Sequence, residues 1–176
     1  MSPIGKLYLK VFLLLGLPFS MGMTIFDIIL GDGFSIFKFI FLFVFFGLFM
    51  SLFLVAKQKR KLKELGVSDY TDSNLKVNQT ATLVSKLNFI ELSQKLQDDV
   101  VLGKMNFDQT KDSIKLSSGA SWRSWGEIIS IQSKELTDGK YEYSISSRPK
   151  MKSTIIDSGK NLENVMAIQR ALENVA

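Results

Sequence analysis

The residue types that carry out most enzyme chemistry are scarce in this chain of 176 residues. It contains no histidine, which is the usual general base near neutral pH and the commonest metal ligand. It also contains no cysteine, so thiolate nucleophiles, disulfides and thiolate metal sites are excluded. No two carboxylates have a spacing that places them together for acid–base catalysis. We therefore expect a protein that is not an enzyme and that holds neither a cofactor nor a metal ion.

The two tryptophans of the chain lie close together in the segment SWRSWGE. Trp122 and Trp125 flank Arg123, just before a predicted strand. One interpretation places both indoles in the core or at its rim, each with a partner for its N–H group. The other makes this segment a contact with a partner or with the bilayer interface, because exposed tryptophan beside arginine is typical of binding hot spots.

Two groups of basic residues are candidates for contacts with anionic lipid. The first group is Lys57, Lys59, Arg60, Lys61 and Lys63, and the second is Arg148, Lys150 and Lys152. The formal net charge is +5, of which residues 57–64 contribute +4, while residues 65–176 carry 14 basic and 14 acidic groups. A nucleic-acid-binding protein is expected to carry its basic excess on the folded domain. The distribution therefore argues against nucleic acid as a partner.

Asp27 and Lys38 are charged residues within two otherwise apolar stretches. Asp27 lies five residues before Asp32 and Lys38 lies six residues after it. At about 1.5 Å per residue, the two side chains reach the same depth in a helical hairpin with Asp32 at its tip. They can form an intramembrane ion pair. Alternatively, Asp27 caps its helix in the headgroup layer while Lys38 reaches water alone.

The apolar stretches themselves predict a transmembrane helical hairpin over residues 1–56. Residues 11–30 and 34–56 are each long enough to cross a hydrocarbon core of about 30 Å, and only residues 31–33 separate them. This region also holds 12 of the 14 phenylalanines. A competing interpretation treats residues 1–22 as a cleaved secretory signal, although the apolar run continues beyond them.

The orientation follows from the flanking basic residues. Lys6 and Lys10 precede the first span and the group at 57–63 follows the second, so both termini are predicted to be cytoplasmic. The predicted location is a bacterial-type cytoplasmic membrane.

Small residues form a stripe on each predicted span. Gly16, Ser20 and Thr24 recur every four residues in the first, and Gly47 and Ser51 do so in the second. Such stripes allow helix backbones to approach closely. They either meet inside the hairpin or receive the helix of a partner.

After a basic juxtamembrane segment and linker (57–80), residues 81–176 predict an α+β domain. Strands are expected at 81–87, 100–107, 113–117, 127–133, 141–147 and 153–157, with helices at 88–98 and from Asn161 onward. Asn88 and Glu91 have capping-box spacing. An antiparallel sheet of four to six strands with two helices is predicted, and a PH-like barrel closed by a C-terminal helix is the alternative. The turn at 157–161 is interpreted as a helix cap, with anion binding as its alternative.

Two functions are compatible with these features. The first is a non-catalytic membrane-anchored accessory or scaffold protein, whose cytoplasmic domain binds another membrane or cytoplasmic protein; a homo-oligomer is compatible with it. The second is a domain that binds lipid headgroups or an apolar ligand at the cytoplasmic membrane surface.

Overall fold

Two units make up the chain in the computed structural model, which describes residues 1–120 and 124–173. The first unit is Met1–Leu75 and the second is Lys76–Ala176. We call the second unit the sheet domain.

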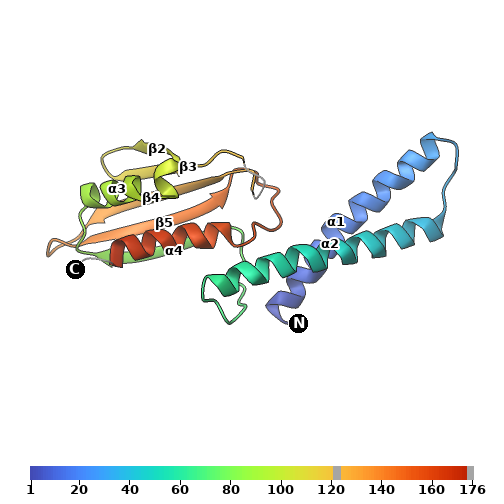
Figure 1. The fold of residues 1–176 in the computed structure, drawn as a ribbon, viewed down its shortest axis with the longest axis horizontal. Helices are drawn as coiled ribbons and strands as arrows, with labels where there is room; N and C mark the ends of the chain where they lie inside the picture. The colour runs from blue at the N-terminus through green and yellow to red at the C-terminus, as the bar shows by residue number, and fades with distance from the viewer. Residues whose placement is uncertain (121–123, 174–176) are drawn as a thin grey trace. The chain divides into compact units, whose positions relative to one another are not determined.

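The first unit is built on a helical hairpin, α1 (Pro3–Ile29) and α2 (Ile36–Glu64), shown in blue to cyan-green in Figure 1. Ser2 and Ser35 cap the two helices, each accepting a hydrogen bond from an N–H group three residues on. Both helices are longer than the predicted apolar spans. α2 continues through the basic residues because Lys, Arg, Gln and Leu are good helix formers, so the helix has no reason to end with the apolar run.

The two helices pack along their lengths through aromatic side chains. Phe12 meets Phe43 edge to face, with ring centroids 4.7 Å apart, and Phe19 stacks on Phe46 at 3.8 Å. Aromatic pairs at these distances contribute more than their buried area alone. The phenylalanines therefore serve the interior of the hairpin as well as its outside.

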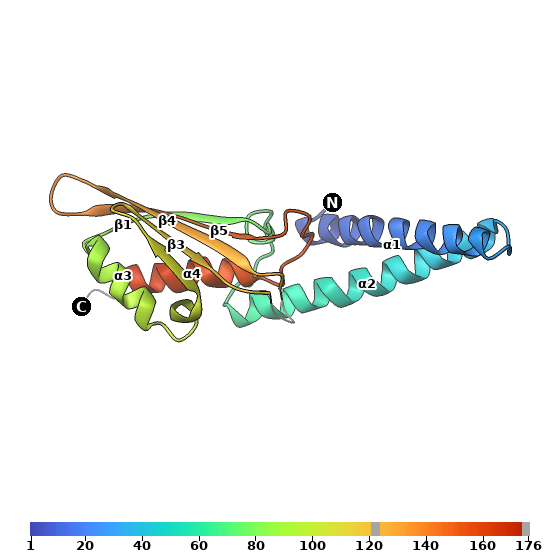
Figure 2. The same cartoon turned by 90° about the horizontal axis from the view of Figure 1, so that it is seen from above.

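The sheet domain contains five antiparallel strands and two α-helices. Its elements are β1 (Gln79–Ser85), α3 (Phe89–Asp98), the short 3₁₀ helix η1 (Leu102–Lys104), β2 (Asn106–Gln109), β3 (Ser113–Ser117), β4 (Glu127–Glu135), β5 (Tyr141–Pro149) and α4 (Lys160–Glu173). The strand order is β1-β5-β4-β3-β2, and α3 and α4 cover one face of the sheet (Figure 2). The sheet is open, with β1 and β2 at its edges, so the α+β prediction is confirmed and the barrel alternative is wrong.

The predicted strand at 100–107 is wrong over most of its length. Asp99 accepts hydrogen bonds from the N–H groups of Val101 and Leu102, both at 2.8 Å, and this turns the chain into η1. Gly103 packs so closely against the carbonyl of Gln97 that a Cβ atom would overlap it. The strand therefore begins only at Asn106.

The predicted strand at 153–157 is also wrong. Thr154 donates hydrogen bonds from its N–H and hydroxyl groups to the carbonyl of Met151, which forms a turn. The preceding strand, β5, is already paired on both sides, by β1 and β4. A further strand at this point has no adjacent sheet edge to join.

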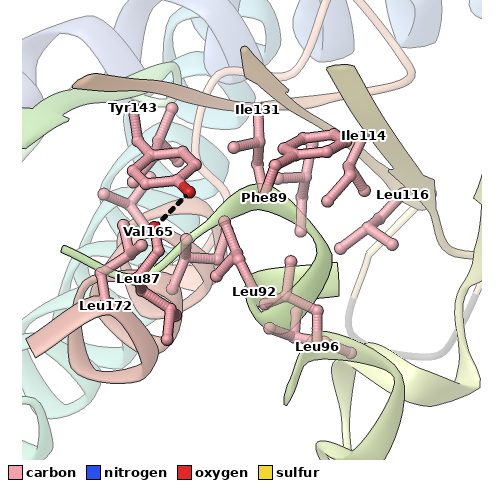
Figure 3. Close-up of a cluster of buried hydrophobic side chains, with 14 of the residues drawn as sticks. Leu87, Phe89, Leu92, Leu96, Ile114, Leu116, Ile131, Tyr143, Val165 and Leu172 are labelled. Carbon is pink, nitrogen blue, oxygen red and sulfur yellow. Dashed lines mark hydrogen bonds between the residues drawn. The ribbon is translucent and has the colours of Figure 1, made fainter. Parts of the chain in front are cut away.

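The core of the domain lies between the sheet and its two helices (Figure 3). Leu92 and Leu96 of α3 are fully buried, as their spacing predicts. The Tyr143 hydroxyl donates a hydrogen bond of 2.7 Å to the carbonyl of Leu87, which joins the middle of the sheet to the chain just before α3. Burial, with smaller contributions from Tyr141 and Glu91, raises the pKa of Tyr143 to about 12.

The buried face of α4 differs from the one that the spacing of apolar residues predicts, which consists of Leu162, Val165, Met166, Gln169, Leu172 and Val175. Val175 lies outside the described residues. Val165 and Leu172 are buried as expected, and so is Ile168, which the prediction omitted. The expected members Leu162, Met166 and Gln169 are only half-buried. The face is rotated because two asparagines, Asn161 and Asn164, are buried on it.

Candidate functional site

The outside of the hairpin is an extended apolar surface. Large apolar side chains from Leu9 to Phe53 are exposed on both helices, and Phe37 and Ile29 are 79% and 74% exposed. By length and composition, α1 and α2 are both able to cross a membrane.

The small-residue stripes meet inside the hairpin. A Cβ atom on Gly16 would lie 2.9 Å from the carbonyl oxygen of Phe43, and one on Gly47 would lie 2.7 Å from the ring of Phe12. Ser20 and Ser51 are buried beside them. Both serine hydroxyls, and that of Thr24, donate to carbonyls of their own helix. The stripes therefore act in packing α1 against α2.

The structure brings Asp27 and Lys38 together. Lys38 Nζ lies 2.8 Å from Asp27 Oδ2, which links the last turn of α1 to the first turn of α2. The Asp27 side chain is 13% exposed and that of Lys38 is 49% exposed. The aspartate is thus screened by the hairpin, while the lysine stem extends over its surface.

The basic group at 57–63 occupies the last two turns of α2. Arg60 and Lys61 each lie 3.7 Å from Glu64, and Lys59 lies over the ring of Tyr70 at 5.6 Å. Arg60 and Lys63 are exposed, whereas Lys57, Lys59 and Lys61 are half-buried. One carboxylate offsets part of the charge, and the segment keeps a positive excess.

The second basic group lies beside a tryptophan. Trp125 is 67% exposed, so it is not a core residue. The next residue, Gly126, accepts a 2.9 Å hydrogen bond from the N–H group of Lys150. Exposed basic residues flank this contact, and Met151 is partly exposed there as well. We call this surface the basic tip; its members are Trp125, Arg148, Lys150, Met151 and Lys152.

The basic tip joins two features that lie far apart in the sequence. The register of β4 and β5 pairs Ile128 with Arg148, which sets the start of one strand beside the end of the other. Trp122 and Arg123 lie outside the described residues, so of the three residues in the tryptophan segment only Trp125 is placed.

One face of the sheet is polar and carries no helix of the sheet domain among the described residues (Figure 2). Thr82 pairs with Ser144, which pairs with Gln132. The next row contains Thr80, Ser146 and Ser130. Directly paired residues point to the same side of a sheet. We call this hydroxyl-rich surface the open face; its members are Thr80, Thr82, Ser130, Gln132, Ser144 and Ser146. Charged residues border it on the same side of the sheet, since Lys115 pairs with Ser130 and Glu142 pairs with Lys134.

A buried polar cluster that the sequence did not reveal ties α4 to β5. The Ser147 hydroxyl donates to Asn161 Oδ1 at 2.7 Å and accepts from Asn164 Nδ2 at 3.2 Å. Asn161 Nδ2 donates in turn to Asp157 at 2.8 Å. All four residues are buried.

Asp157 caps α4, although the sequence favours Asn161 for this role because asparagine is a common N-cap residue. Its carboxylate accepts hydrogen bonds from the N–H groups of Gly159 and Asn161, at 3.1 and 2.8 Å. Burial raises the pKa of Asp157, and these hydrogen bonds oppose the rise. The amides that an anion would need are therefore used by the chain itself, which supports the helix-cap interpretation of this turn over anion binding.

No group of three or more acidic side chains is placed to hold a metal ion in the described ranges 1–120 and 124–173. Comparison of the chain with protein families, with characterised proteins and with solved structures finds no significant match. The function must therefore be argued from the surfaces described above.

Proposed function

We propose that this protein is a non-catalytic scaffold or accessory subunit, anchored in a bacterial-type cytoplasmic membrane by the hairpin. The observation that carries the proposal is the apolar outside of α1 and α2. Soluble monomers rarely expose contiguous apolar patches larger than a few hundred Å². Lipid, by contrast, solvates such a surface without cost, because the helices satisfy their own backbone hydrogen bonds.

The length and charge of α2 support the same proposal. At about 1.5 Å per residue, its 29 residues extend for about 43 Å, more than the hydrocarbon core requires. The excess falls at the basic end, between Lys57 and Glu64. Basic residues at a span end favour the cytoplasmic side, so the sheet domain that follows α2 is assigned to the cytoplasm.

The open face is the proposed protein-binding surface of the sheet domain. Its small hydroxyl and amide side chains offer hydrogen-bond donors and acceptors to a partner, and interfaces of this kind carry about ten direct hydrogen bonds. α3 and α4 cover only the opposite face (Figure 2). The sheet is thus stable with one side available to a partner.

Site-specific photo-cross-linking in native membranes tests this proposal. A photoreactive residue is placed at Thr82 or Gln132 on the open face, and at Arg170, an exposed residue of α4, as the control. We expect one protein, the same from both open-face positions, to be cross-linked and to co-purify in constant proportion. Arg170 is expected to give none of it.

A charge on the open face provides the matched variant. Ser144→Arg places a bulky cation between Thr82 and Gln132, whereas Ser144→Thr keeps the hydroxyl. We expect the first to abolish the cross-link and the second to keep it. Cross-linking that is equal from Arg170, or insensitive to Ser144→Arg, would show that the open face is not the binding surface. Release of the chain from membranes by alkaline carbonate would contradict anchoring itself.

A further inference from the structure

We propose that the basic tip binds the anionic headgroups of the membrane surface, with the indole of Trp125 at the interface. This inference rests on the proposed membrane anchoring and adds a second contact between the chain and the bilayer. The tip lies at one end of the sheet, where Arg148 adjoins the open face one row beyond Ser146.

The strand register places the basic tip at the end of the domain where the chain arrives from the hairpin. β1 begins at Gln79, which pairs with Ser147 near the end of β5. Pro149, two residues further on, pairs with Glu127 at the start of β4. The first residues of the sheet domain and the basic tip therefore share one end of the sheet, the end tethered to the helix that we place in the membrane.

The tip carries positive charge that no exposed carboxylate of the described segments 124–129 and 147–157 offsets. Arg148, Lys150 and Lys152 are exposed. The two acidic residues of the adjoining segments 124–129 and 147–157 are Glu127 and Asp157, and both are buried and hydrogen-bonded, to Ser118 and to the start of α4. The sheet domain carries 14 basic and 12 acidic groups, a net charge of +2, so the concentration of positive charge at the tip is a property of its fold. Each basic residue near an anionic leaflet adds to the electrostatic attraction between the domain and the membrane.

The apolar members of the tip match the same surface. Tryptophan is enriched at membrane interfaces, where its ring is apolar and its N–H group remains near water. Met151 is 41% exposed beside Lys150. Basic and exposed apolar residues together are the combination that membrane-surface segments use, because headgroup attraction and shallow insertion add.

The experiment uses Trp125 as its own reporter. Since the chain has two tryptophans, Trp122→Phe leaves Trp125 as the single indole. The full chain is reconstituted in nanodiscs of phosphatidylcholine, or of phosphatidylcholine with phosphatidylglycerol, carrying lipids brominated near the headgroup. We expect the Trp125 emission to shift to the blue and to be quenched in the anionic nanodiscs. Raising the salt concentration is expected to reverse both effects.

A triple neutralisation and a matched control define the contact. Arg148→Gln, Lys150→Gln and Lys152→Gln together remove three charges from the tip. Lys111→Gln, Lys134→Gln and Lys140→Gln together remove three exposed charges near the opposite ends of the strands. The tip variant is expected to lose the quenching, with docking weakened about fivefold per neutralised residue. The control variant is expected to retain it.

Three outcomes would overturn the inference. The first is equal quenching of Trp125 in neutral and anionic nanodiscs. The second is an equal loss of this quenching in the tip variant and in the control variant. The third is shielding of Trp125 only when a protein partner is added. Incorporation into the nanodisc is measured separately by co-elution with lipid. If the chain incorporates but Trp125 stays unquenched, the inference fails and the proposed anchoring stands. If it does not incorporate, the anchoring itself is contradicted.

Discussion

The ion pair between Asp27 and Lys38 is the residue-scale feature that the proposed bilayer makes most consequential. In a medium of low polarity, a charge that has lost its partner costs more than the absence of both charges. We expect Asp27→Asn and Lys38→Met each to lower the thermal midpoint in detergent. The double variant should lower the thermal midpoint by less than the sum of the two single decreases.

A double-mutant cycle measures the coupling energy between Asp27 and Lys38. Residues in direct contact show coupling energies of about 0.5 kcal/mol or more, whereas independent sites add. The distance of 2.8 Å between Lys38 Nζ and Asp27 Oδ2 places the pair in the first class. Strictly additive losses in the cycle would mean that the two charges do not stabilise one another.

Tyr143 supports a second residue-scale prediction, because its hydroxyl holds a buried carbonyl. Tyr143→Phe keeps the ring in the core and removes the hydrogen bond to Leu87. We expect a loss of about 1–2 kcal/mol in the free energy of unfolding, the usual cost of removing one partner of a buried hydrogen bond. Urea unfolding of the detergent-solubilised chain, followed by tryptophan fluorescence, measures it.

The pKa of Tyr143 adds a pH dependence to that difference. The folded-state pKa of about 12 lies above the ordinary value of 10.0. The contribution of the hydroxyl is therefore complete below pH 10 and is lost as the pH rises toward 12, because the unfolded tyrosine ionises first. The wild type should lose stability more steeply than Tyr143→Phe across this window. Parallel losses would contradict the assignment.

At the scale of elements, the hairpin offers a test of packing with a built-in control. Gly47→Val adds a side chain at a position where even a Cβ atom would lie 2.7 Å from the ring of Phe12. Gly22→Val makes the same change in α1, where nothing lies within 4 Å of the added atom. We expect a loss of about 1–3 kcal/mol for Gly47→Val, the usual range for overpacking, and almost none for Gly22→Val.

The measurement is thermal unfolding of the full chain in detergent, with far-ultraviolet circular dichroism as the signal. Both variants introduce a β-branched residue into a helix, so propensity affects them alike. Equal midpoints for the two variants would mean that α1 and α2 do not pack through Gly47.

The elements that could be predicted from the sequence are those whose signals are local. α3 begins after Asn88 because Asn88 and Glu91, which are three residues apart, form a capping box. Each side chain accepts a hydrogen bond from the backbone N–H group of the other residue. The bounds of β3 also agree with the predicted strand, 113–117, because Ile114 and Leu116 alternate with polar residues. The apolar spans predict the two helices of the hairpin in the same way.

The features that could not be predicted depend on contacts between distant segments. The strand expected at 153–157 fails because β5 has partners on both sides, which only the sheet order reveals. The cap by Asp157 joins a cluster with Ser147, a residue on another element. The basic tip needs the β4–β5 register to bring Trp125 beside Lys150. Asparagines on a helix face carry no apolar signal, so the spacing of apolar residues alone does not locate the buried face of α4.

At the scale of the whole molecule, different types of surface are separated along the chain. Residues 1–56 contain 12 of the 14 phenylalanines, while the sheet domain has a polar open face and a basic tip. Each surface suits a different medium: lipid, a protein partner, and the headgroup layer between them. The proposed anchored scaffold uses all three.

Topology is the whole-molecule prediction on which the others depend, and the absence of native cysteine makes it simple to test. Ser73→Cys and Asp32→Cys each introduce a single thiol at an exposed position, after α2 and at the hairpin tip. In intact cells, a membrane-impermeant thiol reagent should label Asp32→Cys and spare Ser73→Cys, because the basic residues at 57–63 hold the second position in the cytoplasm. After permeabilisation both should react, which shows that protection comes from the membrane and not from the fold. The reverse pattern in intact cells would place the sheet domain outside, away from the cytoplasmic leaflet that the basic tip is proposed to bind.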